Sequence, residues 1–214
     1  MSETVCTIEV WSDVACPFCY LGQKRLDQVL EESGARDRVR VEWKSFLLNP
    51  EQKTDKDIRL ADYLAREKGW DPAQIRQIND RIQQSGEALG IDFRFEKVVV
   101  ANTRRAHRLL QYARRAGKQH ETGEQLFKAY FTDGENVDDS TVLVQIAKAV
   151  GLDVAGLEEM LSGSDWSEAV QSDVEEAAAL GVRGVPFFVF NRQFAVSGAQ
   201  EPEIFRQALE KAGI

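Results

Sequence analysis

The sequence predicts an α/β domain that is interrupted by a large all-helical insertion. Strand-like residues occur only near the two ends of the chain, and helical periodicity fills the middle. Both groups of strands must meet in one sheet to bury their faces. We therefore expect residues 1–50 and 164–214 to form the α/β domain, and residues 51–163 to form a helical insertion domain.

The first part of the chain predicts a strand, a helix and a second strand. Residues 6–11 alternate and are rich in β-branched and aromatic side chains, which is typical of a strand. Apolar residues then recur at helical spacing, and Gly34 follows them as a stop: Leu21, Leu26, Val29 and Leu30. Residues 39–46 alternate again. A parallel pair of strands joined by a helix forms a βαβ unit.

The rest of the chain is helical until close to its end. Apolar stripes predict helices around residues 60–64, 75–89, 103–113, 126–131, 140–147 and 164–181. Strand character returns in residues 187–190 and 194–196, which flank Asn191-Arg192-Gln193 and predict a hairpin. A final amphipathic helix is expected to start at Pro202.

Composition and charge narrow the class of protein. The net charge of −8 over 214 residues argues against nucleic acid or an anionic membrane as the main partner. Met1-Ser2-Glu3-Thr4 has no features of a leader, and no apolar stretch is long enough to span a bilayer. We therefore expect a cytoplasmic protein, in which exposed thiols are kept reduced.

Cys16-Pro17-Phe18-Cys19 lies at the predicted turn from the first strand to the first helix. Free N–H groups and the helix dipole stabilise an anion there, and the thiolate is the form of cysteine that attacks disulfides. Pro17 suits the first helical position. A structural zinc site would need four ligands, and only three scattered candidates remain, namely Cys6, His107 and His120. The motif therefore indicates redox chemistry and no metal, with Cys6 expected in the core.

A CxxC motif at a helix start, followed late in the chain by Gly184-Val185-Pro186 ahead of a hairpin, resembles the thioredoxin fold. With its helical insertion, the chain is similar to the DsbA-like thioredoxins. Residues 12–22, 43–50, 102–109, 184–189 and 197–200 resemble the cytoplasmic FrnE-like branch of that family. The resemblance implies a protein disulfide oxidoreductase without a cofactor. Cys16 would be its nucleophile, Cys19 its resolving thiol, and Val185-Pro186 its cis-proline loop.

A second class of enzyme shares this fold. Kappa-class glutathione transferases and 2-hydroxychromene-2-carboxylate isomerases bind glutathione, but they usually have serine where this chain has Cys16. They also tend to have Ser-Asp where this chain has Ala199-Gln200. Both differences favour the oxidoreductase, and the glutathione-dependent enzyme stays as the alternative.

The expected partners are protein or peptide thiols and disulfides, with glutathione or thioredoxin as a redox partner. Substrate contacts are expected at Pro17, Phe18, Val185 and Pro186, with Phe18 projecting from the turn.

The proton acceptor is not evident from the sequence. Thioredoxins have a buried carboxylate six positions before the first cysteine, and this chain has Val10 there. Glu9, Asp13 and Lys44 are near the motif, and solvated or capping roles are expected for them. His107 is expected on a helix surface.

Overall fold

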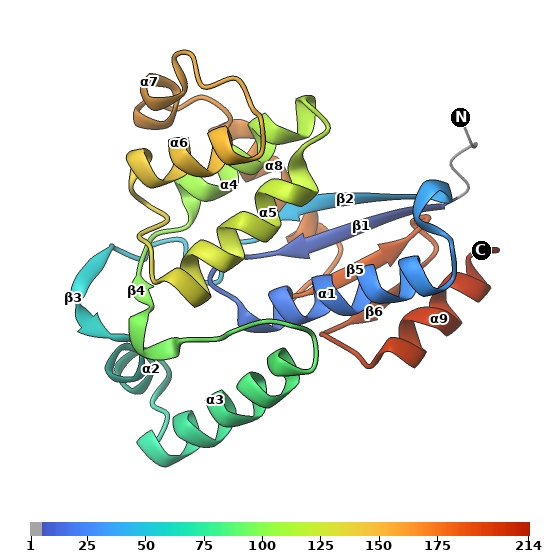
Figure 1. Cartoon of the computed structure of the whole chain (residues 1–214), viewed down its shortest axis with the longest axis horizontal. Helices are drawn as coiled ribbons and strands as arrows, with labels where there is room; N and C mark the ends of the chain where they lie inside the picture. Colours follow the sequence, from blue (N-terminus) through green and yellow to red (C-terminus); the bar gives the residue numbers. More distant parts are fainter. Residues whose placement is uncertain (1–5) are drawn as a thin grey trace. The chain divides into compact units, whose positions relative to one another are not determined.

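A computed structural model describes residues 6–214, which form two compact units (Figure 1). Residues 6–48 and 168–214 form the first unit, and residues 49–167 form the second. Residues 1–5, to which the expectation about a leader refers, lie outside the described residues. Among residues 6–214, no helix combines the length and the apolar character needed to cross a bilayer.

The first unit contains a four-stranded sheet with the order β2-β1-β5-β6. Its strands are β1 (Cys6–Ser12), β2 (Val39–Ser45), β5 (Phe187–Phe190) and β6 (Phe194–Ser197). β1 pairs with β2 in parallel and with β5 antiparallel, so the predicted βαβ unit and the predicted hairpin are both present. Asn191 and Arg192 have positive φ angles in the hairpin turn, as a type I′ turn requires.

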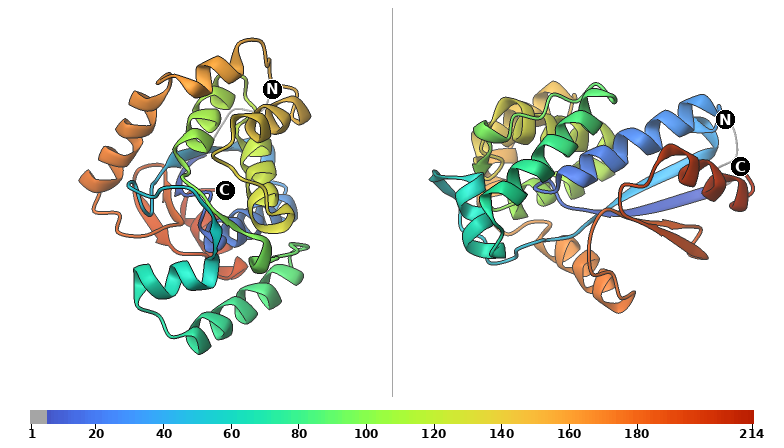
Figure 2. Two further views of the ribbon diagram at one scale, coloured as in Figure 1. Left: turned by 90° about the vertical axis from the view of Figure 1, so that its left-hand side faces the viewer. Right: turned by 90° about the horizontal axis from the view of Figure 1, so that it is seen from below.

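Helices cover both faces of this sheet. α1 (Pro17–Glu32) and α9 (Pro202–Lys211) pack against one face, where Ile8, Val10 and Phe188 are buried. α8 (Ser167–Ala179) packs against the other face, over Trp11 and Val189. The right-hand view of Figure 2 shows α8, in orange, on the opposite side of the sheet from α1, in blue. The alternation of each strand thus supplies two cores, as expected for a sheet between helical layers.

The second unit is mainly helical, as predicted. Its helices are α2 (Leu60–Lys68), α3 (Pro72–Glu87), α4 (Arg104–Arg115), α5 (Gln119–Lys128), α6 (Ser140–Ala149) and α7 (Leu157–Ser162). It also contains a short two-stranded sheet, β3 (Asp55–Arg59) with β4 (Val99–Val100), which the sequence analysis did not predict. β3 has a single apolar residue, Ile58, and β4 has two residues, so neither shows the alternation on which strand prediction depends.

Candidate active site

Cys16 and Cys19 lie where the chain passes from β1 into α1. Cys16 is the N-cap residue of α1, and Pro17 is the first residue of the helix. The backbone N–H of Cys16 donates to the Asp13 carbonyl at 3.0 Å, and that of Cys19 donates to the Cys16 carbonyl at 3.0 Å. These two hydrogen bonds close the turn and bring both cysteines to the positive end of the helix dipole.

Asp13 holds the turn that precedes the cysteines. Its Oδ1 accepts a hydrogen bond from the Ala15 N–H at 3.2 Å, and its Oδ2 accepts one from the Leu48 N–H at 2.7 Å. The carboxylate is buried and accepts hydrogen bonds from N–H groups of the loops that follow β1 and β2. Asp13 is therefore neither solvated nor a helix cap, the two roles expected for it; its carboxylate joins two loops instead.

The two thiols differ in their access to solvent. Cys16 is 5% exposed and Cys19 is fully buried, and both are free thiols, as is Cys6 in the core. The Cys16 thiol donates to the Val185 carbonyl, with 3.6 Å between Sγ and the oxygen. A disulfide that approaches from solvent can therefore reach Cys16 before Cys19.

Burial raises the pKa of Cys19 well above its ordinary value, and the hydrogen bond and charge of Cys16 raise it further. The Ser12 hydroxyl and the Asp13 backbone N–H lower the pKa, but they do not outweigh burial. Cys19 is therefore neutral near pH 7 in the reduced chain. Ser12, at the end of β1, is a site residue that the sequence analysis missed, because a serine in a strand carries no distinctive signal.

The Val185–Pro186 segment faces the cysteines, and its peptide bond is cis. The Pro186 ring packs against Gly22 of α1, where a Cβ atom would lie 3.0 Å from Pro186 Cγ and 3.0 Å from Phe188 Cζ. The Pro186 carbonyl accepts a hydrogen bond from the Gly198 N–H at 2.8 Å. The structure thus brings Val185 and Pro186, two of the expected substrate contacts, to the N-terminal part of α1.

The other two expected substrate contacts lie on the first turn of α1. Pro17 is half-buried, whereas the Phe18 side chain is 44% exposed. An apolar ring with this exposure beside Cys19 is available to a partner.

Glu9 and Lys44 do not have the solvated or capping roles that were expected, because both are buried in a network of ion pairs. Lys44 Nζ lies 2.9 Å from Glu176 Oε2, 3.2 Å from Asp173 Oδ1 and 3.9 Å from Glu9 Oε1. Arg192 of the hairpin turn joins the network by bonding Glu9 at 2.8 and 2.6 Å and Glu176 at 2.7 Å. Partners that come from α8 and from the hairpin allow these charges to be buried.

The charges of this network shift one another's pKa values. Burial lowers the pKa of Lys44, but the hydrogen bond with Glu176 and the charge of Asp173 outweigh it, so the pKa is raised. Burial likewise raises the pKa of Glu176, but Lys44 and Arg192 reverse this effect and lower it. Both side chains are therefore charged at neutral pH, and the network stabilises the face of the sheet under α8.

His107 was expected on a helix surface, and this expectation is wrong. The side chain is 1% exposed on α4, within the second unit. The arginines around it in the sequence suggested a solvated face, but α4 buries residues on more than one side.

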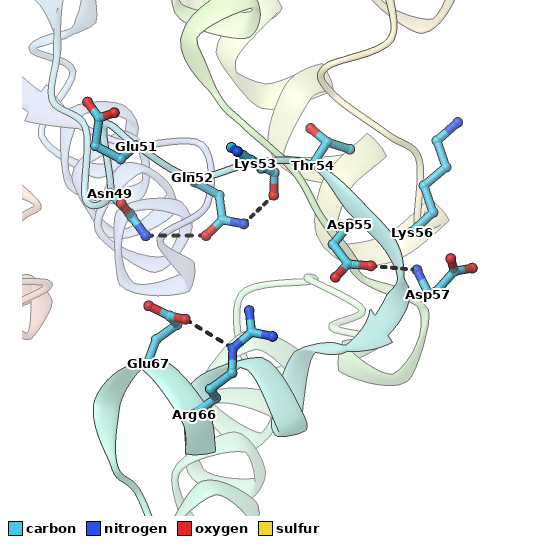
Figure 3. Close-up of a pocket in the computed structure, with 10 residues that line it drawn as sticks. All are labelled: Asn49, Glu51, Gln52, Lys53, Thr54, Asp55, Lys56, Asp57, Arg66 and Glu67. Carbon is cyan, nitrogen blue, oxygen red and sulfur yellow. Dashed lines mark hydrogen bonds and ion pairs between the residues drawn. The ribbon is translucent and has the colours of Figure 1, made fainter.

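The second unit contains a surface pocket of about 800 Å³, shown in Figure 3. It is lined mainly by charged and amide side chains: Asn49, Glu51, Gln52, Lys53, Thr54, Asp55, Lys56, Asp57, Arg66 and Glu67. Arg66 pairs with Glu67 at 3.1 Å, and Asp55 accepts from the Asp57 N–H at 3.0 Å. The lining supplies no thiol or imidazole. Over residues 6–214, no group of three or more His, Cys, Asp or Glu side chains is arranged to hold a metal ion.

Known proteins resemble this chain over almost its whole length. Residues 7–210 match the DSBA-like thioredoxin domain. A probable DsbA oxidoreductase from Streptomyces coelicolor is 34% identical, with a TM-score of 0.90 over 97% of this chain and 90% of that chain.

More distant solved structures share the fold. One is a 2-hydroxychromene-2-carboxylate isomerase, at 16% identity and a TM-score of 0.72 over 96% of this chain and 95% of that one. Another is the cytosolic disulfide reductase DsbM from Pseudomonas aeruginosa, at 18% identity and a TM-score of 0.69 over 96% of this chain and 97% of that one.

Proposed function

We propose that this chain, which belongs to the DsbA-like thioredoxin family, exchanges disulfides with protein or peptide substrates through Cys16 and Cys19. The observation that carries the proposal is the pair of free thiols at the start of α1, with Cys16 against the Val185 carbonyl and Cys19 buried behind it. This arrangement suits an attacking thiol and a resolving thiol.

Reduction of a substrate begins at Cys16. Its thiolate attacks one sulfur of the substrate disulfide, the substrate S–S bond breaks, and the leaving thiolate takes up a proton. A mixed disulfide then joins Cys16 to the substrate. Cys19 loses its proton and attacks the Cys16 sulfur, which releases the substrate as a second thiol and leaves a Cys16–Cys19 disulfide. The substrate gains two electrons and the chain loses two; the reverse sequence oxidises a substrate dithiol.

Substrate contacts in this proposal come from both sides of Cys16. The exposed Phe18 ring would pack against apolar residues next to the substrate cysteine. The backbone of Val185 would pair with an extended substrate segment, in the manner of strand addition. Pro17 and Pro186 would shape the surface between these contacts.

We propose the cytoplasm as the place of action, because exposed thiols are kept reduced there, and attack by Cys16 on a substrate disulfide requires its reduced form. Glutathione or thioredoxin would then return the Cys16–Cys19 disulfide to the dithiol. The neighbouring DsbM structure was also solved with glutathione, which makes glutathione the first redox partner to test.

A glutathione-dependent isomerase or transferase is the second candidate, since the isomerase fold matches over most of both chains. Cys16 and Ala199-Gln200 count against it, as they differ from the residues usual in that class. Tight glutathione binding together with activity that does not depend on the redox state of Cys16 would favour this candidate.

The direct test compares three variants, each with one cysteine replaced, in an insulin reduction assay. Cys16→Ser should lose at least about two powers of ten in rate, and Cys19→Ser should accumulate mixed disulfides that mass spectrometry maps to Cys16. Cys6→Ala is the matched control, because it removes a core thiol outside the motif and should stay active. Full activity of Cys16→Ser, or adducts mainly on Cys19, would overturn the assignment.

The direction of electron flow follows from the reduction potential of the pair, measured in a glutathione redox series. A value near thioredoxin's ~−270 mV would indicate a reductase, and one near DsbA's ~−120 mV would indicate an oxidant.

A further inference from the structure

Arg25 ties α1 to the loop that follows the hairpin. Its Nη1 donates to the Ala199 carbonyl at 2.6 Å and to the Gln200 carbonyl at 3.3 Å, and its Nη2 lies 2.9 Å from Glu201 Oε1. The Arg25 side chain is 12% exposed, whereas that of Glu201 is 73% exposed. A guanidinium that donates to two successive carbonyls fixes the path of the backbone, which neutralising a carboxylate alone would not do.

The same loop holds the carbonyl of Pro186. Phe187 of β5 pairs with Ser197 at the end of β6, and the next residue, Gly198, donates its N–H to the Pro186 carbonyl at 2.8 Å. Gly198 has a φ of +82°, a conformation that L side chains rarely adopt. The loop can therefore make this hydrogen bond only in a specific backbone path, and Arg25 holds the residues that come directly after it.

We propose that Arg25 is a positioning residue for the Val185–Pro186 segment, acting through the loop of residues 198–201. The inference rests on the proposed function, in which the backbone of Val185 receives the substrate. Cys16 is the N-cap residue of α1 and Arg25 lies within this helix, so one helix sets the position of the attacking sulfur and of the loop behind the substrate contact. Loss of Arg25 releases the Gly198–Pro186 hydrogen bond and disorders the substrate contact, while the thiols keep their place at the start of α1.

The experiment compares Arg25→Gln with Arg25→Lys and with Arg206→Gln. Arg206 of α9 is the matched control, because it is another arginine that binds carboxylates at α1, through Glu32 at 2.7 Å, and within α9, through Glu203 at 3.1 Å, and neither partner belongs to the loop of residues 198–201. Arg25→Gln should raise KM for a peptide disulfide about fivefold to tenfold with kcat within about twofold. Its reaction with the small reagent 5,5′-dithiobis(2-nitrobenzoate) should stay within about twofold of the wild type.

Amide hydrogen exchange at Gly198 provides a readout that does not depend on activity. Exchange should be about tenfold faster in Arg25→Gln, unchanged in Arg206→Gln, and intermediate in Arg25→Lys, which keeps one donor for the Ala199 carbonyl. If Arg25→Gln does not fold, the lysine variant carries the test.

Unchanged Gly198 exchange in the Arg25 variants, or an equal effect in Arg206→Gln, would overturn the proposal. A wild-type protein that neither reduces a disulfide nor oxidises a dithiol would refute the proposed function, and Gly198 exchange would still decide whether Arg25 positions the loop.

Discussion

Ser12→Ala should slow the step in which Cys19 resolves the mixed disulfide. In that intermediate Cys16 carries no charge, so the Ser12 hydroxyl and the Asp13 N–H are the polar groups that favour the Cys19 thiolate against burial. A hydrogen bond to a charged group contributes about 1.5–3 kcal/mol, which corresponds to roughly 10- to 150-fold less thiolate without it. A more basic thiolate is also a better nucleophile. The higher intrinsic rate of attack therefore recovers about half of the logarithm of the loss in thiolate. The expected net effect is about 3- to 12-fold.

The assay mixes reduced protein with a peptide disulfide, quenches with acid and follows the mixed disulfide by mass spectrometry. Because loss of the hydroxyl raises the pKa of Cys19, the rate profile of the variant should move to higher pH. Ser45→Ala is the matched control: Ser45 is the register partner of Ser12 and is also buried. Resolution at the wild-type rate in Ser12→Ala between about pH 6 and 9, or equal slowing in Ser45→Ala, would refute the reasoning.

Three further changes test the packing around the site. Lys44→Met removes the cation that Asp173 and Glu176 share and should destabilise the fold by about 3 kcal/mol, or roughly 6–12 °C in Tm, measured by circular dichroism. The pKa of Glu176 is lowered in the folded chain, so its ion pair with Lys44 stabilises the fold at neutral pH and is lost as the carboxylate takes up a proton below about pH 4.5. The difference in stability between Lys44→Met and the wild type should therefore shrink below that pH. A difference under about 1 kcal/mol at neutral pH would contradict the prediction. Phe18→Ser should change stability by less than about 0.5 kcal/mol and raise KM for unfolded protein but not for a small disulfide; equal effects on both substrates would count against a substrate contact. Gly22→Ala should lower the free energy of unfolding in urea by about 1 kcal/mol, because the close approach of its Cβ to the buried Phe188 outweighs the gain in helix propensity. A stabilised variant would show that Pro186 and Phe188 can move to make room.

Much of the fold was predictable because its signals are local. The alternation in residues 6–11 and 39–46 and the apolar runs 187–190 and 194–196 mark strands, and Gly34 and Pro202 mark where helices end and begin. β3 and β4 were not predictable in the same way. They are short and carry few apolar residues, so their pairing is a property of the folded unit and not of either segment alone.

The charged residues near the site show the limit of local reasoning. Glu9 and Lys44 were expected to be solvated, since a charge is seldom buried without a partner. Their partners, Asp173, Glu176 and Arg192, lie more than a hundred residues further along the chain, and only the packed sheet brings them within hydrogen-bonding distance.

The sequence by itself determined where the two thiols lie, because a strand, a CxxC motif and a helix in direct succession put Cys16 and Cys19 on the first turn of that helix. The tertiary structure decided what surrounds them. Val185 comes to Cys16 from a segment 169 residues further along the chain, and the loop that follows the hairpin binds the carbonyl of Pro186 through Gly198. Burial and hydrogen bonding depend on neighbours in space, and the fold alone sets the distances between segments far apart in the chain.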